Sequence, residues 1–282
     1  MSSITHPADL PAPAPFPAED KAIVFDDVAI SFEENEVLKS ISFALTRGET
    51  KVLLGIAGSG KSTILKLALG LLRPDRGRIW VLGQEVTAMT EQDLFALRSR
   101  VGMVFQESAL FDSLTVRENV GYRLMEDHSL SAGEVEQRVA EALRFVELEH
   151  TLDMFPSELS GGMRRRVAIA RAIVTRPEVI LYDSPTGGLD PITSTTIIEL
   201  ILKQRDVYKT TALMVTHRLQ DAFVMATNCF DTKQNKMVPI GRDSTTDVET
   251  TFLVLRDGCV IFDGAAEQLV ETRDEYIREY IA

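Results

Sequence analysis

Residues 55–63 read Gly-Ile-Ala-Gly-Ser-Gly-Lys-Ser-Thr, a glycine-rich turn followed by a lysine and two hydroxyl side chains. An apolar stretch, residues 51–54, precedes the turn, and a stretch with helical character, residues 64–69, follows it. Glycines let successive backbone N–H groups face one anion, and a helix N-terminus adds partial positive charge. The order of strand, glycine-rich turn and helix therefore predicts a cradle for the phosphates of a nucleoside triphosphate.

Each residue of this turn is a candidate nucleotide contact: Gly55, Ile56, Ala57, Gly58, Ser59, Gly60, Lys61, Ser62 and Thr63. Lys61 is expected to reach the β- and γ-phosphates, and the Ser62 hydroxyl to coordinate Mg²⁺. The alternative is a tight turn with a purely structural role. Because the bare pattern arises by chance in roughly one chain in a hundred of this length, that alternative is the weaker interpretation.

Composition narrows the class of protein. The 282 residues suit one large domain or a domain with a subdomain, and 45% hydrophobic with 26% charged residues is typical of a globular chain. No apolar run approaches the ~20 residues that cross a bilayer. No basic segment followed by an apolar stretch begins the chain, so we expect no secretory signal. Two cysteines, Cys229 and Cys259, are too few for a disulfide framework, and reduced thiols are expected.

The charge balance argues against nucleic acid as a partner. The net charge is −12, from 42 acidic and 30 basic residues, whereas nucleic-acid binding normally needs a basic face. One basic cluster, residues 164–166 with Arg171, is the exception. The four histidines are scattered without the spacing of a zinc site.

The first 21 residues differ from the rest of the chain. Residues 1–20 hold five of the eleven prolines and little periodic apolar content, which predicts a disordered or extended tail over 1–21. From residue 22 short apolar runs separated by turn-like residues predict strands, with one helix before the last of them. These strands are Ile23–Phe25, Val28–Phe32, Ile41–Leu45, Val52–Leu54, Arg78–Leu82 and Val101–Phe105, and the helix is Glu91–Arg100.

Residues 107–160 resemble a helical subdomain inserted into this α/β pattern. Over Ser131–Leu148, apolar residues recur every three or four positions, and Ser131 with Glu134 predicts a capping box. Strand–helix alternation then predicts a parallel sheet, from the helix Gly162–Thr175 through Val179–Tyr182, Ile192–Arg205, Thr211–Val215 and Leu219–Ala226.

The last fifty residues are less regular. Residues 233–250 are polar and uneven and predict a loop. Phe252–Leu255 and Cys259–Phe262 flank Asp257-Gly258, the pattern of a hairpin. A main domain over 22–272 is then followed by a closing segment, 273–282, with a helix from Asp274 to Ile281.

Leu159-Ser-Gly-Gly-Met163 follows the helical insert directly. Together with the phosphate turn, this motif resembles the signature of ATP-binding cassette (ABC) ATPases, and the resemblance covers roughly residues 22–272. It implies an α/β fold of the P-loop NTPase class, with a mostly parallel sheet, an antiparallel β subdomain and the helical insert. In that family Ser160, Gly161 and Gly162 clamp the γ-phosphate of ATP held by a second copy. The alternative is that these residues only cap a helix, with Ser160 as the N-cap and no contact to nucleotide.

The resemblance extends to other positions. Asp183, at the end of the apolar run 179–183, matches the Walker B carboxylate that holds Mg²⁺ through water. Gln106 matches the Q-loop residue that reaches Mg²⁺ and the attacking water, although an ordinary polar strand end is the alternative. Asp190 matches the D-loop at the dimer interface, and His217 the switch histidine that touches the γ-phosphate.

Phe32 lies 29 residues before Lys61, where the family places an aromatic ring against adenine. A core aromatic in a strand is an equally open interpretation of this residue.

One position departs from the pattern. The family places glutamate after the Walker B aspartate to polarise the attacking water, and this chain has Ser184. General bases are typically worth about 10²–10⁴-fold in rate, and a serine hydroxyl is a far poorer base. Three explanations stay open: an engineered slow form, a switch with little turnover, or, as favoured here, a natural variant in which Gln106, His217 and positioning supply the rate.

Three segments, residues 108–120, 156–166 and 188–193, resemble the ATPases of Mla-type lipid transporters. The resemblance implies a homodimer on the cytoplasmic face of a bacterial inner membrane, using ATP and Mg²⁺. It also implies a permease bound at a groove that includes residues 106–114, and an MCE-domain lipid-binding protein. The cargo would be phospholipid or another lipid.

Other assignments are weighed by what they require. An amino-acid-type importer would share every motif, so it remains the alternative, as does an ATP switch. A DNA-repair or chromosome ABC ATPase would need a coiled coil, zinc motifs or a basic face. A ribosome-acting factor would need two cassettes in one chain.

Overall fold

The computed structural model describes residues 20–126, 130–241 and 249–281. Most of the predicted tail lies outside these ranges, and its boundary is corrected, because Lys21 already begins the first strand. In the part of the chain described, no helix is long and apolar enough to span a membrane.

An antiparallel sheet forms one layer of the molecule. It contains β1 (Lys21–Phe32), β2 (Asn35–Thr46), β4 (Arg76–Val81) and β5 (Gln84–Glu85), in the order β2-β1-β4-β5. The two strands predicted over 23–32 are one strand, with a register shift between Phe25 and Val28. Asp27 takes a φ of 49° there, so a bulge lets two aspartates face outward while apolar residues on both sides stay buried.

The main sheet has the order β12-β11-β3-β8-β7-β6. Its strands are β3 (Thr50–Leu54), β6 (Val101–Val104), β7 (Val179–Asp183), β8 (Thr211–Val215), β11 (Thr250–Arg256) and β12 (Cys259–Ala265). All neighbours are parallel except β11 and β12, which form the predicted hairpin. Parallel strands require helical crossovers, so their carboxyl ends meet at one edge, where ligands of open α/β sheets bind.

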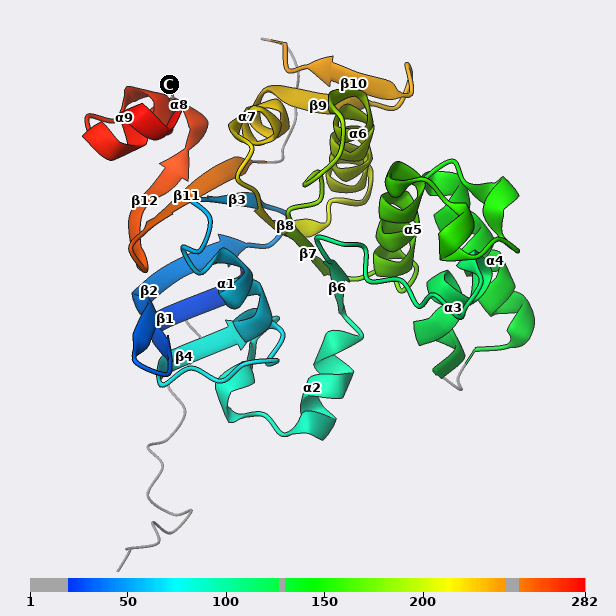
Figure 1. The fold of residues 1–282 in the computed structure, drawn as a ribbon, viewed down its shortest axis with the longest axis horizontal. Coiled ribbons are helices and arrows are strands. Elements are labelled where there is room, and N and C mark those ends of the chain that lie inside the picture. Colours follow the sequence, from blue (N-terminus) through cyan, green and yellow to red (C-terminus); the bar gives the residue numbers. More distant parts are fainter. Residues whose placement is uncertain (1–19, 127–129, 242–248, 282) are drawn as a thin grey trace, which may run out of the picture.

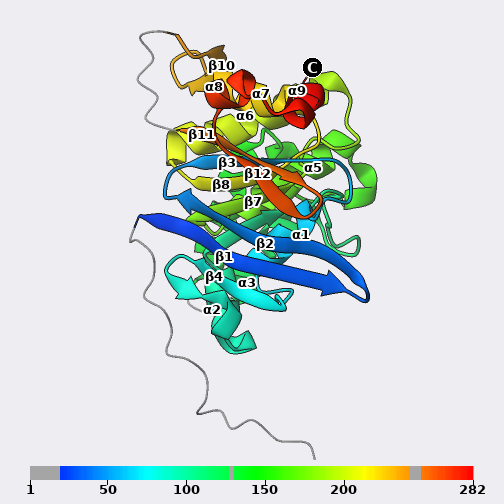
Figure 2. The same cartoon turned by 90° about the vertical axis from the view of Figure 1, so that its left-hand side faces the viewer.

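Side chains of alternate residues in the main sheet point to opposite faces, where they pack into two separate hydrophobic cores. Val52 and Leu54 pack in one cluster with Ile180, whereas Leu53 packs in the other with Leu181. The first core lies under α5 (Gly161–Ile173), α6 (Pro191–Tyr208) and α7 (Leu219–Thr227). The second lies against α1 (Lys61–Ala68), α2 (Glu91–Arg98) and the antiparallel sheet. Figure 1 shows these layers on opposite sides of the main sheet, and Figure 2 shows β1 and β2 as a layer of their own.

The helical subdomain comprises α3 (Val116–Glu126), α4 (Ala132–Phe145) and α5, and it forms a lobe beside β6 in Figure 1. Short 3₁₀ turns at Val86–Ala88, Glu149–Thr151 and Pro156–Glu158 complete the connections. The predicted capping box of α4 is confirmed. Glu134 N–H donates to Ser131 Oγ at 3.3 Å, and Ser131 N–H donates to Glu134 Oε2 at 2.8 Å.

The prediction of a loop over 233–250 is wrong for its first part. β9 (Asn228–Asp231) and β10 (Lys236–Pro239) form an antiparallel hairpin instead. Asp231 Oδ1 accepts the Lys233 N–H at 2.8 Å, and Glu199 Oε1 accepts the Met237 N–H at 2.8 Å. These side-chain contacts stabilise β10, a four-residue strand that is too short to show an alternating pattern. Residues 242–248 lie outside the described ranges.

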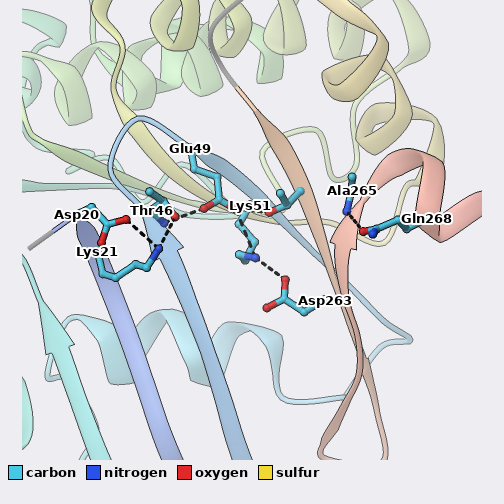
Figure 3. Close-up of polar contacts among 9 residues, drawn as sticks. Asp20, Lys21, Thr46, Glu49, Lys51, Asp263, Ala265 and Gln268 are labelled. Carbon is cyan, nitrogen blue, oxygen red and sulfur yellow. Dashed lines mark hydrogen bonds and ion pairs between the residues drawn. The ribbon is translucent and has the colours of Figure 1, made fainter. Parts of the chain in front are cut away.

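The C-terminal segment contains α8 (Ala266–Glu271), which the sequence did not predict, and α9 (Glu275–Ile281), which it did. Figure 3 shows polar contacts around the start of β3, including the ion pairs of Lys51. Lys51, only 4% exposed, lies between Glu49 at 3.4 Å and Asp263 at 2.5 Å. Because a buried charge is costly unless paired, this contact ties β12 to the start of β3 across the intervening strand β11.

Candidate functional site

The turn between β3 and α1 has the conformation that its glycines permit. Gly55 has a φ of 153° and Gly60 a φ of 91°, which L side chains rarely adopt. A Cβ at Gly55 would lie 2.7 Å from the Leu255 carbonyl oxygen, and one at Gly60 would lie 2.5 Å from Leu38 Cδ2. Neither position tolerates a side chain, so the backbone can wrap closely around Lys61.

Lys61 is enclosed by this turn. Its Nζ donates to the Gly55 carbonyl at 2.8 Å, to the Ile56 carbonyl at 2.7 Å and to Ser59 Oγ at 3.3 Å. The side chain is 8% exposed, and burial lowers the pKa of its ammonium while the nearby Asp183 carboxylate raises it. The Lys61 ammonium is thus held by two backbone carbonyls and one serine hydroxyl of the turn.

Ser62 and Asp183 meet from two elements far apart in sequence. Ser62 Oγ, in the first turn of α1, donates to Asp183 Oδ1, at the end of β7, at 3.0 Å. Hydroxyl and carboxylate oxygens are ligands that Mg²⁺ accepts, usually together with phosphate oxygens and water. In the described part of the chain, no group of three or more His, Cys, Asp or Glu side chains could hold a metal alone. This pair fits Mg²⁺ as two oxygen ligands, and a bound ion would take its other ligands from water and phosphate.

A cavity of about 400 Å³ lies over the turn. Its lining brings together nine of the residues that the sequence singled out, with Val37 and Val215 as apolar walls: Ala57, Gly58, Gly60, Lys61, Ser62 and Thr63 from the turn, and Gln106, Ser184 and His217 from beyond the ends of β6, β7 and β8. Because these strands are parallel neighbours of β3 or of one another, the sheet itself gathers these side chains at one edge.

Ser184 occupies a constrained position in this cavity. Its φ is 45°, and its N–H donates to the Val215 carbonyl at 2.9 Å, across to β8. Its own carbonyl accepts the Gly187 N–H at 2.9 Å. These bonds fix the backbone where the family pattern has glutamate, and the side chain that faces the cavity is an uncharged hydroxyl.

Other predicted residues do not line this cavity. Ser160 begins α5 and its Oγ accepts the Met163 N–H at 3.2 Å, with Gly161 exposed and Gly162 half-buried beside it. Asp190 begins α6, where it accepts the Thr193 N–H at 3.0 Å and hydroxyl at 2.6 Å. These hydrogen bonds lower the pKa of Asp190. Within one chain, both motifs are capped helix starts.

Phe32 ends β1 and is 44% exposed. The alternative of a core aromatic is therefore wrong, since the ring is available at the surface.

The sequence analysis noted the arginines at 164–166 but not what they contact, and it missed a second polar network near the cavity. The buried Arg165 donates from Nη1 to the Phe105 carbonyl at 2.9 Å and from Nη2 to the Gly187 carbonyl at 3.3 Å. It joins α5 to the segments around Gln106 and Ser184, and burial lowers its pKa. The neighbouring arginines Arg164 and Arg166 donate to carbonyls at 2.6 and 3.1 Å, so the basic cluster serves this chain's own backbone.

The second network links the segments that carry Ser184 and His217. Thr186 Oγ1 donates to Asp221 Oδ2, and Arg218 Nε lies 3.4 Å from the same carboxylate oxygen. Arg218 also donates to Ser194 Oγ at 2.7 Å. No sequence motif predicts these contacts, because the loops that carry the residues come together only in the folded chain.

The fold and the turn define a P-loop ATPase of the cassette type. The family described as ABC transporter matches residues 38–187, and the chain belongs to that family. Among solved structures it is similar to the ATP-binding cassette MJ0796 in a dimeric post-hydrolysis state with ADP and Pi (TM-score 0.72, 28% identity, covering 86% of this chain and 98% of that one). It is also similar to cbiO1 from Clostridium perfringens (TM-score 0.74, 28% identity, covering 93% and 94%).

Curated relatives point in more than one direction. The protein trigalactosyldiacylglycerol 3 of Arabidopsis thaliana chloroplasts is 45% identical over 190 residues, covering 64% of this chain and 54% of the relative. The methionine import protein MetN of Bifidobacterium longum is 36% identical over 207 residues (71% and 51%). The probable ribonucleotide transport protein mkl of Mycobacterium leprae is 36% identical over 207 residues (73% and 60%). The chain thus matches about half to three-fifths of the length of these relatives.

Proposed function

We propose that this chain is the ATP-binding and ATP-hydrolysing subunit of an ABC transporter, acting as a homodimer that drives a membrane permease. The observation that carries the proposal is the convergence of Lys61, the Ser62–Asp183 pair, Gln106 and His217 on one cavity. A purely structural glycine turn would not need a buried ammonium, a hydroxyl–carboxylate pair and two further polar side chains at the same sheet edge.

In this proposal the turn binds the phosphates through its backbone N–H groups and through Lys61. Ser62, Asp183 and Gln106 hold Mg²⁺, directly or through water, and the ion neutralises phosphate charge. The exposed ring of Phe32 stacks on adenine. His217, which lines the same cavity as the turn, contacts the γ-phosphate.

The proposal gives the two capped helix starts a role in the assembled dimer. Ser160, Gly161 and Gly162 of a second copy would close over the γ-phosphate, and Asp190 would lie at the interface. Ser160, Gly161 and Asp190 are exposed in one chain, which supports this role, because a γ-phosphate clamp supplied by a partner has to be accessible.

Hydrolysis at this site has to proceed without the usual glutamate, because Ser184 stands in its place. We propose slow turnover in which Gln106 and His217 orient the attacking water and positioning supplies most of the rate. An ATP switch with little hydrolysis is the competing outcome, and it follows from the uncharged Ser184 side chain alone.

The permease is proposed to dock between the main sheet and the helical subdomain. A depression of about 290 Å³ lies there, lined by Phe105, Ala109, Phe111 and Tyr122 among others. Phe111 is 45% exposed, and Arg171 holds its loop by donating to the Ser108 and Ala109 carbonyls at 2.8 Å each. An exposed aromatic ring on a fixed loop, beside Tyr122 of α3, suits a partner helix.

The proposed cargo is phospholipid or another lipid, moved with an MCE-domain protein at the cytoplasmic face of a bacterial inner membrane. The support is the Mla-type pattern of three segments and the 45% identity to a relative named after a galactolipid. An amino-acid-type importer is the second candidate, favoured by the 36% identity to a methionine import protein.

Purification of the tagged chain from its native membranes tests the branch. Recovery of a permease with an MCE-domain protein would support lipid transport, and recovery of a solute-binding protein would overturn it. Steady-state phosphate release by the same complex, compared with Lys61→Ala, tests hydrolysis. Equal rates for the wild type and Lys61→Ala would rule out native catalysis at this site.

A further inference from the structure

The C-terminal helix α9 reaches back to the first residue of the phosphate turn, 225 positions earlier in the chain. The Tyr280 hydroxyl accepts the Gly55 N–H at 3.3 Å and lies 3.3 Å from the Gly55 carbonyl oxygen, to which it donates. Both contacts are at the long end of the hydrogen-bond range, so each one alone is weak. Together they hold both polar atoms of one backbone position.

The Tyr280 ring is itself held in place. It stacks on Tyr276 with a centroid distance of 6.1 Å and an interplanar angle of 10°. The Arg256 guanidinium lies 4.6 Å from the centroid of the Tyr276 ring, and Ile277 anchors the helix at 1% exposure. Burial raises the pKa of Tyr280, so its hydroxyl keeps the proton that it donates at neutral pH.

Gly55 is also the point where Lys61 is tied down. Lys61 carries three N–H donors, and its three contacts are Gly55 O, Ile56 O and Ser59 Oγ. A bound phosphate can accept from Lys61 only when at least one of these donors turns away from its present acceptor. Where the released acceptor is the Gly55 carbonyl, that carbonyl keeps one donor in this structure, the Tyr280 hydroxyl.

We propose that Tyr280 is a positioning residue for nucleotide binding, which keeps the Gly55 peptide satisfied while Lys61 turns toward the phosphates. This inference rests on the proposed function of the turn. The hydroxyl contributes more when nucleotide is bound than when Lys61 shares the carbonyl, and only such a difference changes affinity. A tyrosine that merely packs α9 against the sheet would affect both states equally.

The matched test uses two tyrosines of the same helix. In the part of the chain described, the buried Tyr276 hydroxyl has no hydrogen-bond partner, so Tyr276→Phe removes an equivalent group without removing a hydrogen bond. The full chain is titrated with fluorescent methylanthraniloyl-ADP in the presence of Mg²⁺. Because ADP has no γ-phosphate, ATP hydrolysis does not disturb the measured affinity. Tyr280→Phe is expected to raise the Kd about two- to fivefold, and Tyr276→Phe to leave it unchanged.

Amide hydrogen exchange without nucleotide gives a readout independent of binding. Tyr280→Phe is expected to speed exchange in the peptide that contains Gly55, and Tyr276→Phe is not. Unchanged affinity in Tyr280→Phe, or equal weakening in both variants, overturns the inference while the proposed function stands. Failure of the wild-type chain to bind the fluorescent nucleotide overturns both.

Discussion

The two halves of the proposed ATP site are built in different ways. The cavity half, around Lys61, Asp183 and His217, is assembled by neighbouring parallel strands and linked by hydrogen bonds across the sheet. The clamp half, Ser160 to Gly162 with Asp190, consists of exposed helix starts whose polar groups cap their own helices. Under the proposed function, the contrast implies that one chain would prepare phosphate binding alone, whereas the closing step would need a second surface.

The largest expected effect concerns the residue that departs from the family pattern. Ser184→Glu places a carboxylate in the cavity, and phosphate release by the assembled complex should rise by about 10²–10⁴-fold, the usual worth of a general base. Lys61→Ala is the background control. An unchanged rate in Ser184→Glu would show that the cavity half does not limit turnover, and that the clamp half or the permease does.

The next effect tests whether the cavity half binds without its partner. Lys61→Ala removes an ammonium that would donate to the phosphates, and two charge-assisted hydrogen bonds predict a loss of roughly 100-fold in ADP affinity. The measurement is equilibrium titration of the monomeric chain. Affinity within threefold of the wild type would contradict the assignment of this turn.

The clamp half can be separated from the cavity half by a matched pair of serines. Ser160→Ala and Ser131→Ala each remove an N-cap hydroxyl, at a cost of about 1 kcal/mol to the helix. Only Ser160→Ala should reduce ATP-dependent dimerisation and phosphate release, by about tenfold, and neither should alter ADP affinity by more than about twofold. Similar behaviour of the two variants in the dimerisation assay would remove the proposed role of the signature motif.

Lys61, Gln106, Ser184 and His217, which the sequence singled out, line one cavity because they follow short buried strands of the main sheet. Parallel topology then makes the meeting of Gln106, Ser184 and His217 a consequence of strand order. The helical insert and the β11–β12 hairpin were predicted for similar reasons of periodicity and turn chemistry.

The features that were missed depend on tertiary contacts. The sequence around Arg165 does not indicate that its guanidinium donates to the Phe105 and Gly187 carbonyls, which lie on two distant loops. β10 is a strand because β9 and Glu199 supply partners, and Tyr280 matters because α9 folds back onto Gly55. Local sequence patterns cannot predict contacts between residues that lie far apart in the chain.

The smallest expected effect is a pH dependence at the clamp half. Hydrogen bonds from Thr193 lower the pKa of Asp190 in the folded chain, so its ionised form is favoured by folding. A depressed folded pKa gives stabilisation that is present above the unfolded pKa, near 3.9, and is lost as pH falls through the folded value. The thermal unfolding midpoint of the wild type should therefore exceed that of Asp190→Asn at pH 7, and the gap should shrink below about pH 4. A gap that stays constant down to pH 3 would mean that Asp190 caps α6 through geometry alone, and the charge would then be free to act at the dimer interface.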